Sequence, residues 1–253
     1  MRARRVEGYY SRQLGLLGDN IGTIIEHFAP GGVVKSITRL QEALDKYAMT
    51  LDPWAEAVAS SMLEQVSQRD AMAWFEAADE IGLALRKELK ATPIGEIQNL
   101  LMQRQVHLIK SLPIEAAERV HRLVNLNLVE QHRAEEIRDQ ILRSGRVTVG
   151  RAQLIARTEV ARAQSNFTEA RAKHIGSKGY IWRTVGDSDV RPHIGIANFH
   201  KLNTLAHGSH RKLEGTYHTW DKPPIAGPKG ERAHPGCIYN CRCFAEPVLP
   251  DVI

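Results

Sequence analysis

The chain has 253 residues, of which 43% are hydrophobic and 25% are charged. This length is enough for one large domain or two ordinary ones, and no run of about eighteen apolar residues is present that would cross a bilayer. The first ten residues are basic but lack the apolar stretch of a signal peptide, so we expect a protein made in the cytoplasm with no membrane partner.

The formal net charge of +5 is concentrated after residue 150. Residues 151–253 carry 15 Lys and Arg against 9 Asp and Glu, together with seven of the eleven histidines. A basic surface of this kind suits a polyanion such as nucleic acid, or an acidic protein face. A surface that only keeps the domain soluble is an equally good interpretation.

Residues 1–145 are predicted to be helical. Asp52 followed by Pro53 is typical of a helix start, and this helix is expected to run to Gln65. A second start is predicted at Ser67–Asp70, which resembles a capping box with Asp in place of Glu. A further helix is expected to start near Pro113, and Trp74 and His121 are expected to pack in the core. The apolar stripe of that further helix has spacings of mostly three or four: Ile114, Ala117, Val120, His121, Val124 and Leu128.

Gly145–Gly150 is predicted to interrupt the helical pattern and to separate two domains, 1–145 and 146–253. Beyond it, Arg151–Ile175 contains neither Gly nor Pro and is predicted to form one long helix that ends at Gly176. Tyr180–Val185 has the aromatic and β-branched content of a strand. The predicted fold class is therefore α+β: a helical N-terminal region, then a small module with a long helix, short strands and a C-terminal loop that contains Cys and His. One face of the long helix is mostly small: Leu154, Thr158, Ala161, Ser165, Thr168 and Ala172.

All three cysteines lie in the last twenty residues, next to a histidine. An odd number of cysteines in a cytoplasmic product argues against a disulfide framework and for free thiols or metal ligands. Reduced thiols packed at a domain edge are one interpretation, and a structural zinc site is the other. A Cys/His nucleophile pair is a further alternative, because an imidazole base could activate a nearby thiol. The candidate zinc ligands are His193, His234, Cys237, Cys241 and Cys243.

Four short motifs in order resemble one known family. They are Ala156–Glu159 on the long helix, the strand Tyr180–Val185, Asp187 with Arg191 and His193, and the terminal His234-Pro235 with Cys241-Arg242-Cys243. Together they resemble the phage Mu F-like minor head proteins, over roughly residues 145–247. The chain departs from that pattern where Cys237–Asn240 splits the terminal motif and where Asn203–His218 lengthens a loop.

The resemblance implies a structural protein of the virion rather than an enzyme. It implies a role in head morphogenesis at the portal vertex or the capsid interior, with the portal protein and the major capsid or scaffold proteins as partners. It also implies occasional DNA contact. From their positive charge, Lys201, Arg211 and Lys212 are the candidates for phosphate contact, and without a helix-turn-helix or finger such contact should be weak and sequence-independent. The structural motif residues that the resemblance selects are Arg157, Thr158, Glu159, Asp187, Arg191, His193, His234, Cys241 and Cys243.

Arg157 is a long charged side chain among small ones. We expect it to be buried and to reach Asp187 or the carbonyls of the terminal loop. The alternative for this segment is a solvated Glu159–Arg162 pair one helical turn apart. The alternative function is an enzyme, such as a nuclease, a transferase or a thiol-dependent activity, built on the terminal His/Cys loop.

Overall fold

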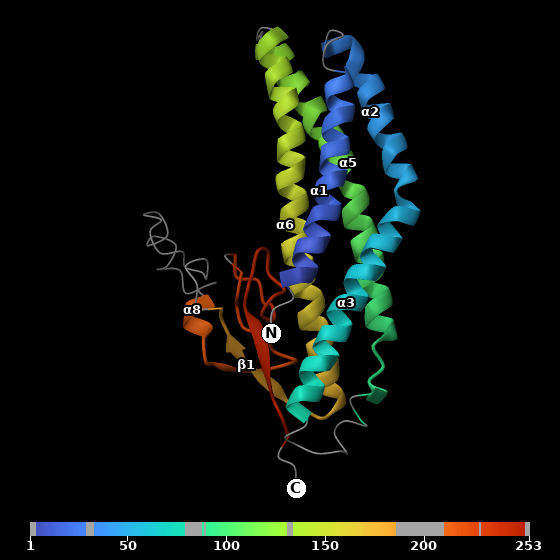
Figure 1. The fold of residues 1–253 in the computed structure, drawn as a ribbon. Helices are drawn as coiled ribbons and strands as arrows, with labels where there is room; N and C mark the ends of the chain where they lie inside the picture. Colours follow the sequence, from blue (N-terminus) through green and yellow to red (C-terminus); the bar gives the residue numbers. More distant parts are fainter. Residues whose placement is uncertain are drawn as a thin grey trace. The chain divides into compact units, whose positions relative to one another are not determined.

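The computed structural model describes residues 4–28, 33–78, 88, 90–130, 134–185, 210–227 and 229–250. It confirms the α+β class: the chain is mainly helical, with a small three-stranded antiparallel sheet and the Cys/His loop near the C-terminus (Figure 1). The elements, in chain order, are α1 (Arg4–Phe28), α2 (Val33–Thr50), α3 (Asp52–Ala78), α5 (Gly95–Glu130), α6 (Ala134–His174), β1 (Gly179–Arg183), α8 (His210–Leu213), β2 (Tyr217–Thr219) and β3 (Phe244–Val248).

The chain forms two compact units, each assembled from separate stretches of sequence. We call Arg4–Met62 with Leu100–Arg157 the helical unit, and Met1–Ala3, Leu63–Asn99 and Thr158–Ile253 the mixed unit. The boundaries fall inside α3, α5 and α6, whereas the sequence predicted a single division between residues 145 and 146. A compact unit can contain segments that are far apart in the sequence, and local sequence patterns do not reveal which distant segments pack together.

The helical unit is a bundle of helices with an apolar core. α1 buries Val6, Tyr10, Leu14, Leu17, Ile21 and Ile25, at spacings of four or three, so one stripe of this helix faces its neighbours. In the core, the Tyr10 hydroxyl donates a hydrogen bond to Gln105 Oε1 at 2.9 Å, and both side chains are buried. Because both polar groups find a partner, burying them costs little.

Glycine allows α1 and α6 to approach closely. A Cβ on Gly18 would lie 3.0 Å from Val149 Cγ2 and 3.1 Å from its Cα, and a Cβ on Gly145 would lie 3.1 Å from the Cα of Gly22. The predicted break at Gly145–Gly150 is wrong, because α6 runs through it without interruption. The glycine that suggested a boundary instead lies at a contact between two helix backbones.

We expect Gly18→Ala and Gly15→Ala to change stability in opposite directions. Ala is the better helix former by roughly 1 kcal/mol, and nothing lies within 4 Å of a Cβ at Gly15, so that variant should be more stable. At Gly18 the added methyl would press on the backbone of α6, at a cost of roughly 1–3 kcal/mol. Urea unfolding of both variants checks this, and equal shifts for the two would contradict the close approach.

Two predicted helix starts lie inside longer helices. Pro113 lies within α5, and Ser67–Asp70 lies within α3. α5 continues through the proline because Ile109 and Leu112 before it and Ala116 after it are all buried, and tertiary packing outweighs local propensity. His121 is exposed, so its predicted core position is wrong. Trp74 is buried as predicted.

The mixed unit is organised around a sheet of order β2-β1-β3. β1 pairs antiparallel with both neighbours, with Tyr180 opposite His218 on one side and Pro247 on the other. The predicted strand at Tyr180–Val185 and the predicted helix end are confirmed, since α6 ends at His174 and Gly176 follows with φ +85°. The core of this unit contains Trp74, Ala172, Tyr180, Trp182, Trp220, Ala226, Cys241 and Cys243.

Among the described residues, no helix combines the length and the apolar character that crossing a bilayer requires.

Candidate functional site

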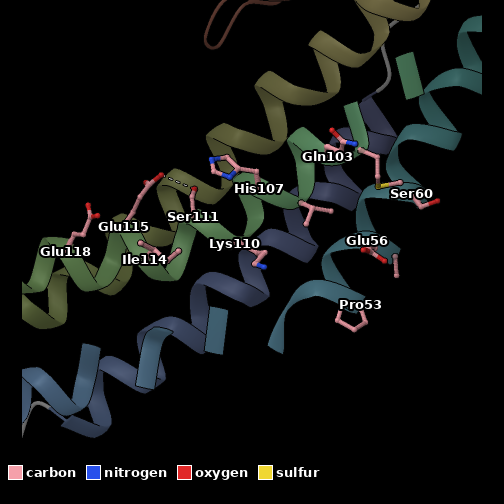
Figure 2. A pocket seen from close by; sticks show the side chains of 13 residues that line it. Pro53, Glu56, Ser60, Gln103, His107, Lys110, Ser111, Ile114, Glu115 and Glu118 are labelled. Atoms are coloured by element: carbon pink, nitrogen blue, oxygen red, sulfur yellow. Dashed lines mark hydrogen bonds between the residues drawn. The ribbon is translucent and has the colours of Figure 1, made fainter. Parts of the chain in front are cut away.

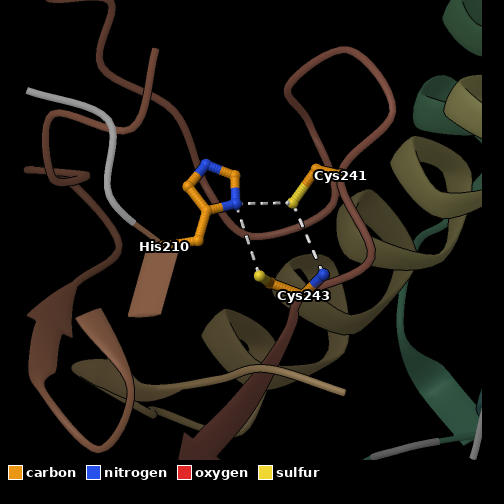
Figure 3. Close-up of side chains that lie close together, drawn as sticks. All are labelled: His210, Cys241 and Cys243. Carbon is orange, nitrogen blue, oxygen red and sulfur yellow. Dashed lines mark hydrogen bonds between the residues drawn. The ribbon is translucent and has the colours of Figure 1, made fainter. Parts of the chain in front are cut away.

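His210, Cys241 and Cys243 form a buried cluster in the mixed unit (Figure 3). His210 Nδ1 lies 3.4 Å from Cys241 Sγ and 3.5 Å from Cys243 Sγ. All three ligand atoms lie within 4.8 Å of one another, and no residue of the cluster is more than 5% exposed. Three groups that commonly bind metals thus converge from α8, the terminal loop and the residue just before β3.

Two tight turns shape the loop that carries the thiols. Gly236 has φ +86° and Asn240 has φ +54°, a left-handed backbone that Gly and Asn adopt most readily. A Cβ on Gly236 would lie 3.0 Å from the carbonyl oxygen of Ala161 on α6, so the loop backbone lies against the small face of the long helix. The sequence predicted that this face allows close approach, and the structure confirms it here.

The two thiols of the cluster are electrostatically unequal. The hydrogen bond from Cys243, opposed by burial and aided by His210, holds the pKa of Cys241 well below its usual range. The pKa of Cys243 is raised, chiefly because its thiol is the donor in that pair and because it is buried. Cys241 is therefore the sulfur that loses its proton first.

His234 does not belong to the cluster, although the sequence placed it among the candidate metal ligands. Its Nδ1 lies 3.0 Å from the Tyr180 hydroxyl, and its Nε2 lies 3.7 Å from Glu169 Oε2. Its ring also packs against Tyr180 and Trp220, with centroids 5.5 and 5.8 Å away. These contacts make it a packed polar residue between α6 and the sheet.

We expect His234 to make the fold less stable in mild acid. Burial lowers the pKa of His234, and the carboxylate of Glu169 only partly opposes this. The unfolded chain therefore takes up a proton near pH 6.5 before the folded chain does, so stability is complete above that pH and falls as the pH drops below it. Urea midpoints at pH 7 and pH 5 should differ less for His234→Asn than for the wild type, with the exposed His121→Asn as control. An unchanged pH dependence in His234→Asn would contradict this.

Cys237 also lies outside the cluster. Burial raises the pKa of its thiol, and its backbone carbonyl accepts a hydrogen bond from Arg162 Nη2 at 2.6 Å. The sequence predicted an arginine of the long helix on the carbonyls of the terminal loop, and such a contact exists, but Arg162 makes it. Arg157, the residue predicted to do so, is 39% exposed and pairs with Glu7 at 3.4 Å within the helical unit. The predicted burial of Arg157 is therefore wrong.

Thr158 and Glu159 lie at the start of the α6 segment that belongs to the mixed unit. Thr158 Oγ1 accepts a hydrogen bond from the backbone N–H of Asn240 at 3.1 Å. Glu159 is buried and pairs with Arg162 at 3.3 Å, so the alternative of a solvated pair does not hold. The helix motif of the family resemblance thus contacts Asn240, in the stretch that splits the terminal motif.

A second buried polar group joins α3 to the end of α6. The Arg171 guanidinium and the Thr168 hydroxyl both donate to the Asp70 carboxylate, and Arg171 Nη2 also lies 3.3 Å from the Ser67 hydroxyl and carbonyl oxygens. Burial raises the pKa of Asp70, while its two donors oppose the shift. Ser67 and Asp70, which the sequence suggested as ends of a capping box, instead bind Arg171, which is 101 positions from Asp70.

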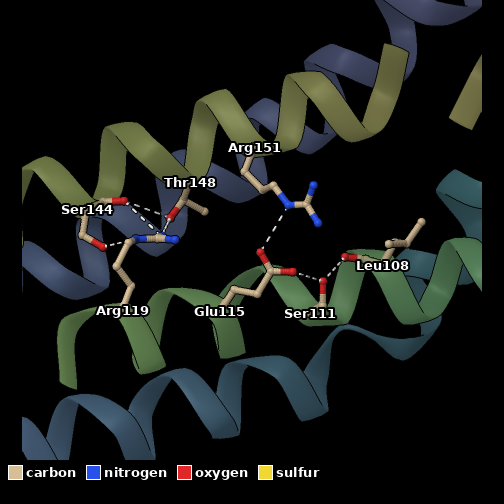
Figure 4. A network of polar contacts seen from close by, with 7 residues as sticks. All are labelled: Leu108, Ser111, Glu115, Arg119, Ser144, Thr148 and Arg151. Carbon is tan, nitrogen blue, oxygen red and sulfur yellow. Dashed lines mark hydrogen bonds and ion pairs between the residues drawn. The ribbon is translucent and has the colours of Figure 1, made fainter. Parts of the chain in front are cut away.

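In the helical unit, polar and apolar side chains together line an open groove of about 1100 Å³ between α3 and α5 (Figure 2). Nearby, Arg119 donates from Nε to the Ser144 hydroxyl at 2.8 Å and from Nη2 to Thr148 Oγ1 at 2.7 Å (Figure 4). Arg151 pairs with Glu115 at 3.2 Å. These contacts join α5 to α6 and do not converge on a point where a ligand would be held.

The remaining predicted residues give a mixed outcome. Arg211 and Lys212 lie on α8, where Lys212 is exposed and Arg211 is partly buried. Asp187, Arg191, His193 and Lys201 lie outside the described residues. His210 is the member of the cluster that the sequence did not select as a ligand, because thirty-one positions separate it from Cys241 and no short motif joins them.

Comparison with known proteins gives one distant relative. The chain is 28% identical over 234 residues to an uncharacterized protein of Haemophilus influenzae, in a match that covers 90% of this chain and 47% of that protein. The chain thus spans about half the length of this relative. No family model matches, and no solved structure matches.

Proposed function

We propose that the chain is a phage minor head protein that resembles the Mu F-like proteins and acts in head assembly at the portal or the inner capsid. The observation that carries the proposal is the contact between two motifs of the resemblance, where Nδ1 of His234 in the terminal motif lies 3.0 Å from the hydroxyl of Tyr180 in the strand motif. These motifs are fifty-four positions apart in the sequence and belong to one packed unit, as expected if the ordered motifs mark a single module. The work of such a module is binding, with the portal protein and capsid or scaffold proteins as partners.

The test is quantitative mass spectrometry of purified procapsids and mature particles of the phage or prophage that encodes the chain. We expect the chain at a fixed, low ratio to portal subunits in at least one of the two. Particles from a strain that lacks the gene provide the background. Absence from both kinds of particle would overturn the proposal.

The alternative is an enzyme that uses a Cys/His pair. A nucleophilic thiol must reach its substrate, whereas Cys241 and His210 are 3% and 2% exposed. This burial favours a structural role for the pair. Cys241→Ala separates the two proposals, since a structural cysteine should lower both the melting temperature and particle assembly. A catalytic cysteine should leave the fold intact and abolish turnover.

We also propose weak, sequence-independent DNA contact through the basic residues of α8, Arg211 and Lys212, together with Lys201. The support is the exposed position of Lys212 and the basic character of this half of the chain. Binding to a random duplex should weaken steeply between 50 and 200 mM salt, and Lys212→Ala should reduce that salt dependence. Binding that does not change over this range would argue against phosphate contacts.

A further inference from the structure

We infer that His210, Cys241 and Cys243 bind one zinc ion, which fastens the terminal loop to α8 and to the start of β3. Nothing in this inference depends on the role in head assembly. It differs from the site expected from the sequence, because His210 replaces His234 and because Cys237 lies elsewhere.

The distances suit a tetrahedral zinc ion. Zinc binds thiolate sulfur at about 2.3 Å and imidazole nitrogen at about 2.0–2.1 Å, so tetrahedral angles place nitrogen and sulfur about 3.6 Å apart and two sulfurs about 3.8 Å apart. The two nitrogen–sulfur distances are 3.4 and 3.5 Å, and the sulfurs lie within 4.8 Å of each other. Binding therefore requires only small side-chain adjustments.

The imidazole of His210 is held in the orientation that a metal ligand needs. Its Nε2 lies 3.0 Å from the carbonyl oxygen of Ala226. A carbonyl can only accept, so Nε2 carries the hydrogen and donates it. In the neutral ring this leaves the lone pair on Nδ1, the atom that faces both sulfurs (Figure 3). A metal-binding histidine commonly donates its other ring N–H to a backbone carbonyl in this way.

The surroundings of the Cys241 sulfur likewise stabilise its thiolate form. It accepts hydrogen bonds from the backbone N–H groups of Gly236 and Cys243, each at 3.4 Å. Donors of this kind favour the thiolate, which is the form that binds metal. The left-handed turns at Gly236 and Asn240 orient these two backbone N–H groups toward the sulfur of Cys241.

The ligand set selects the class of metal. Thiolate and imidazole are soft and borderline ligands that suit zinc, whereas calcium and magnesium require oxygen. Two thiolates also balance the double positive charge of zinc, so the buried site becomes neutral overall when both thiol protons leave. Within the described residues the cluster has three ligands, and water or another group of the chain completes the coordination.

The site would act as a cross-link, since its ligands come from two places that are far apart in the chain. Cys241 and Cys243 are thirty-one and thirty-three positions from His210. Among the described residues, the sheet in this unit has three short strands, and Cys241 and Cys243 belong to its core. A zinc ion here would supply much of the stability of the loop.

The experiment uses the full chain, produced in zinc-supplemented medium and purified under reducing conditions. We expect one zinc per chain by elemental analysis for the wild type, and much less for Cys241→Ser, Cys243→Ser and His210→Ala. Cys237→Ser is the matched control, because it removes a cysteine outside the cluster and should keep one zinc. A strong chelator should lower the melting temperature of the wild type and of Cys237→Ser alike.

A second measurement uses the wild type, so that it remains informative if some of the variants fail to fold. Cobalt added to the metal-free wild type should give the visible absorption of a tetrahedral ion and a sulfur-to-metal charge-transfer band, both of which zinc then abolishes. Wild type without zinc, without a cobalt spectrum and without a response to chelator would overturn the inference, as would loss of zinc in Cys237→Ser.

Discussion

Arg171→Met should lower the free energy of unfolding by about 3–5 kcal/mol, one of the largest effects expected of a single substitution in this chain. Arg171 and Asp70 are each about 5% exposed at their side chains, and the guanidinium contacts the carboxylate directly. Removing the arginine leaves a buried carboxylate whose remaining side-chain donor is the Thr168 hydroxyl. An uncompensated buried charge costs much more than an ion pair contributes at the surface.

The matched control for this prediction is Lys173→Met, two positions further along the same helix. Lys173 is 45% exposed and pairs with Glu169 at 2.7 Å, so its removal should cost less than about 1 kcal/mol. The double variant Asp70→Leu with Arg171→Met should recover a large part of the stability, because no charge is then left unpaired. Urea unfolding measures all three. A loss in Arg171→Met no greater than that in Lys173→Met would show that the buried pair contributes little.

Trp182→Ala should also cost about 3–5 kcal/mol, through the cavity that it leaves. Trp182 is fully buried in β1, where it pairs with Ala245 of β3, and its ring meets that of His210 edge-on with centroids 5.3 Å apart. The substitution therefore removes a large side chain from the core of the mixed unit and also removes packing from one wall of the His210 cluster. We expect a lower melting temperature together with weaker retention of metal.

Trp54→Ala is the control for Trp182→Ala, since Trp54 is only partly buried at the start of α3. It should cost less stability and leave the metal content unchanged. Thermal melting and elemental analysis on the same preparations give both readouts. If both tryptophan variants lost stability equally, the core position of Trp182 would not be the cause.

The sequence predicted those parts of the fold that depend on local chemistry. The strand at Tyr180, the end of the long helix before Gly176 and the small face of that helix could all be predicted, because each follows from the residue types in one short segment. The predictions at Pro113 and Gly145 failed for a common reason. In both places tertiary packing decides the structure, and a residue that usually breaks a helix lies inside one.

Two of the three residues of the candidate site could be predicted from the sequence. The sequence indicated Cys241 and Cys243, because side chains two positions apart in an extended segment point to the same side. It indicated His234, which lies next to the cysteines in the sequence, instead of His210, which is thirty-one positions from Cys241 and which only the folded chain brings to the thiols. Similarly, Asp70 has the sequence context of a helix cap, and its true partner is 101 positions away.

The distance between Asp70 and Arg171 along the chain has a consequence for the order of events during synthesis. The ribosome adds about 5–20 residues per second, so some 5–20 seconds separate the appearance of the carboxylate from that of its guanidinium partner. During this interval Trp74, on the same helix, also lacks Tyr180, Trp182 and Trp220, which join it in the finished core. The mixed unit can therefore complete its folding only after its last buried core residues, Cys241 and Cys243, have been synthesised, and until then a nascent chain exposes an apolar surface that a chaperone would recognise.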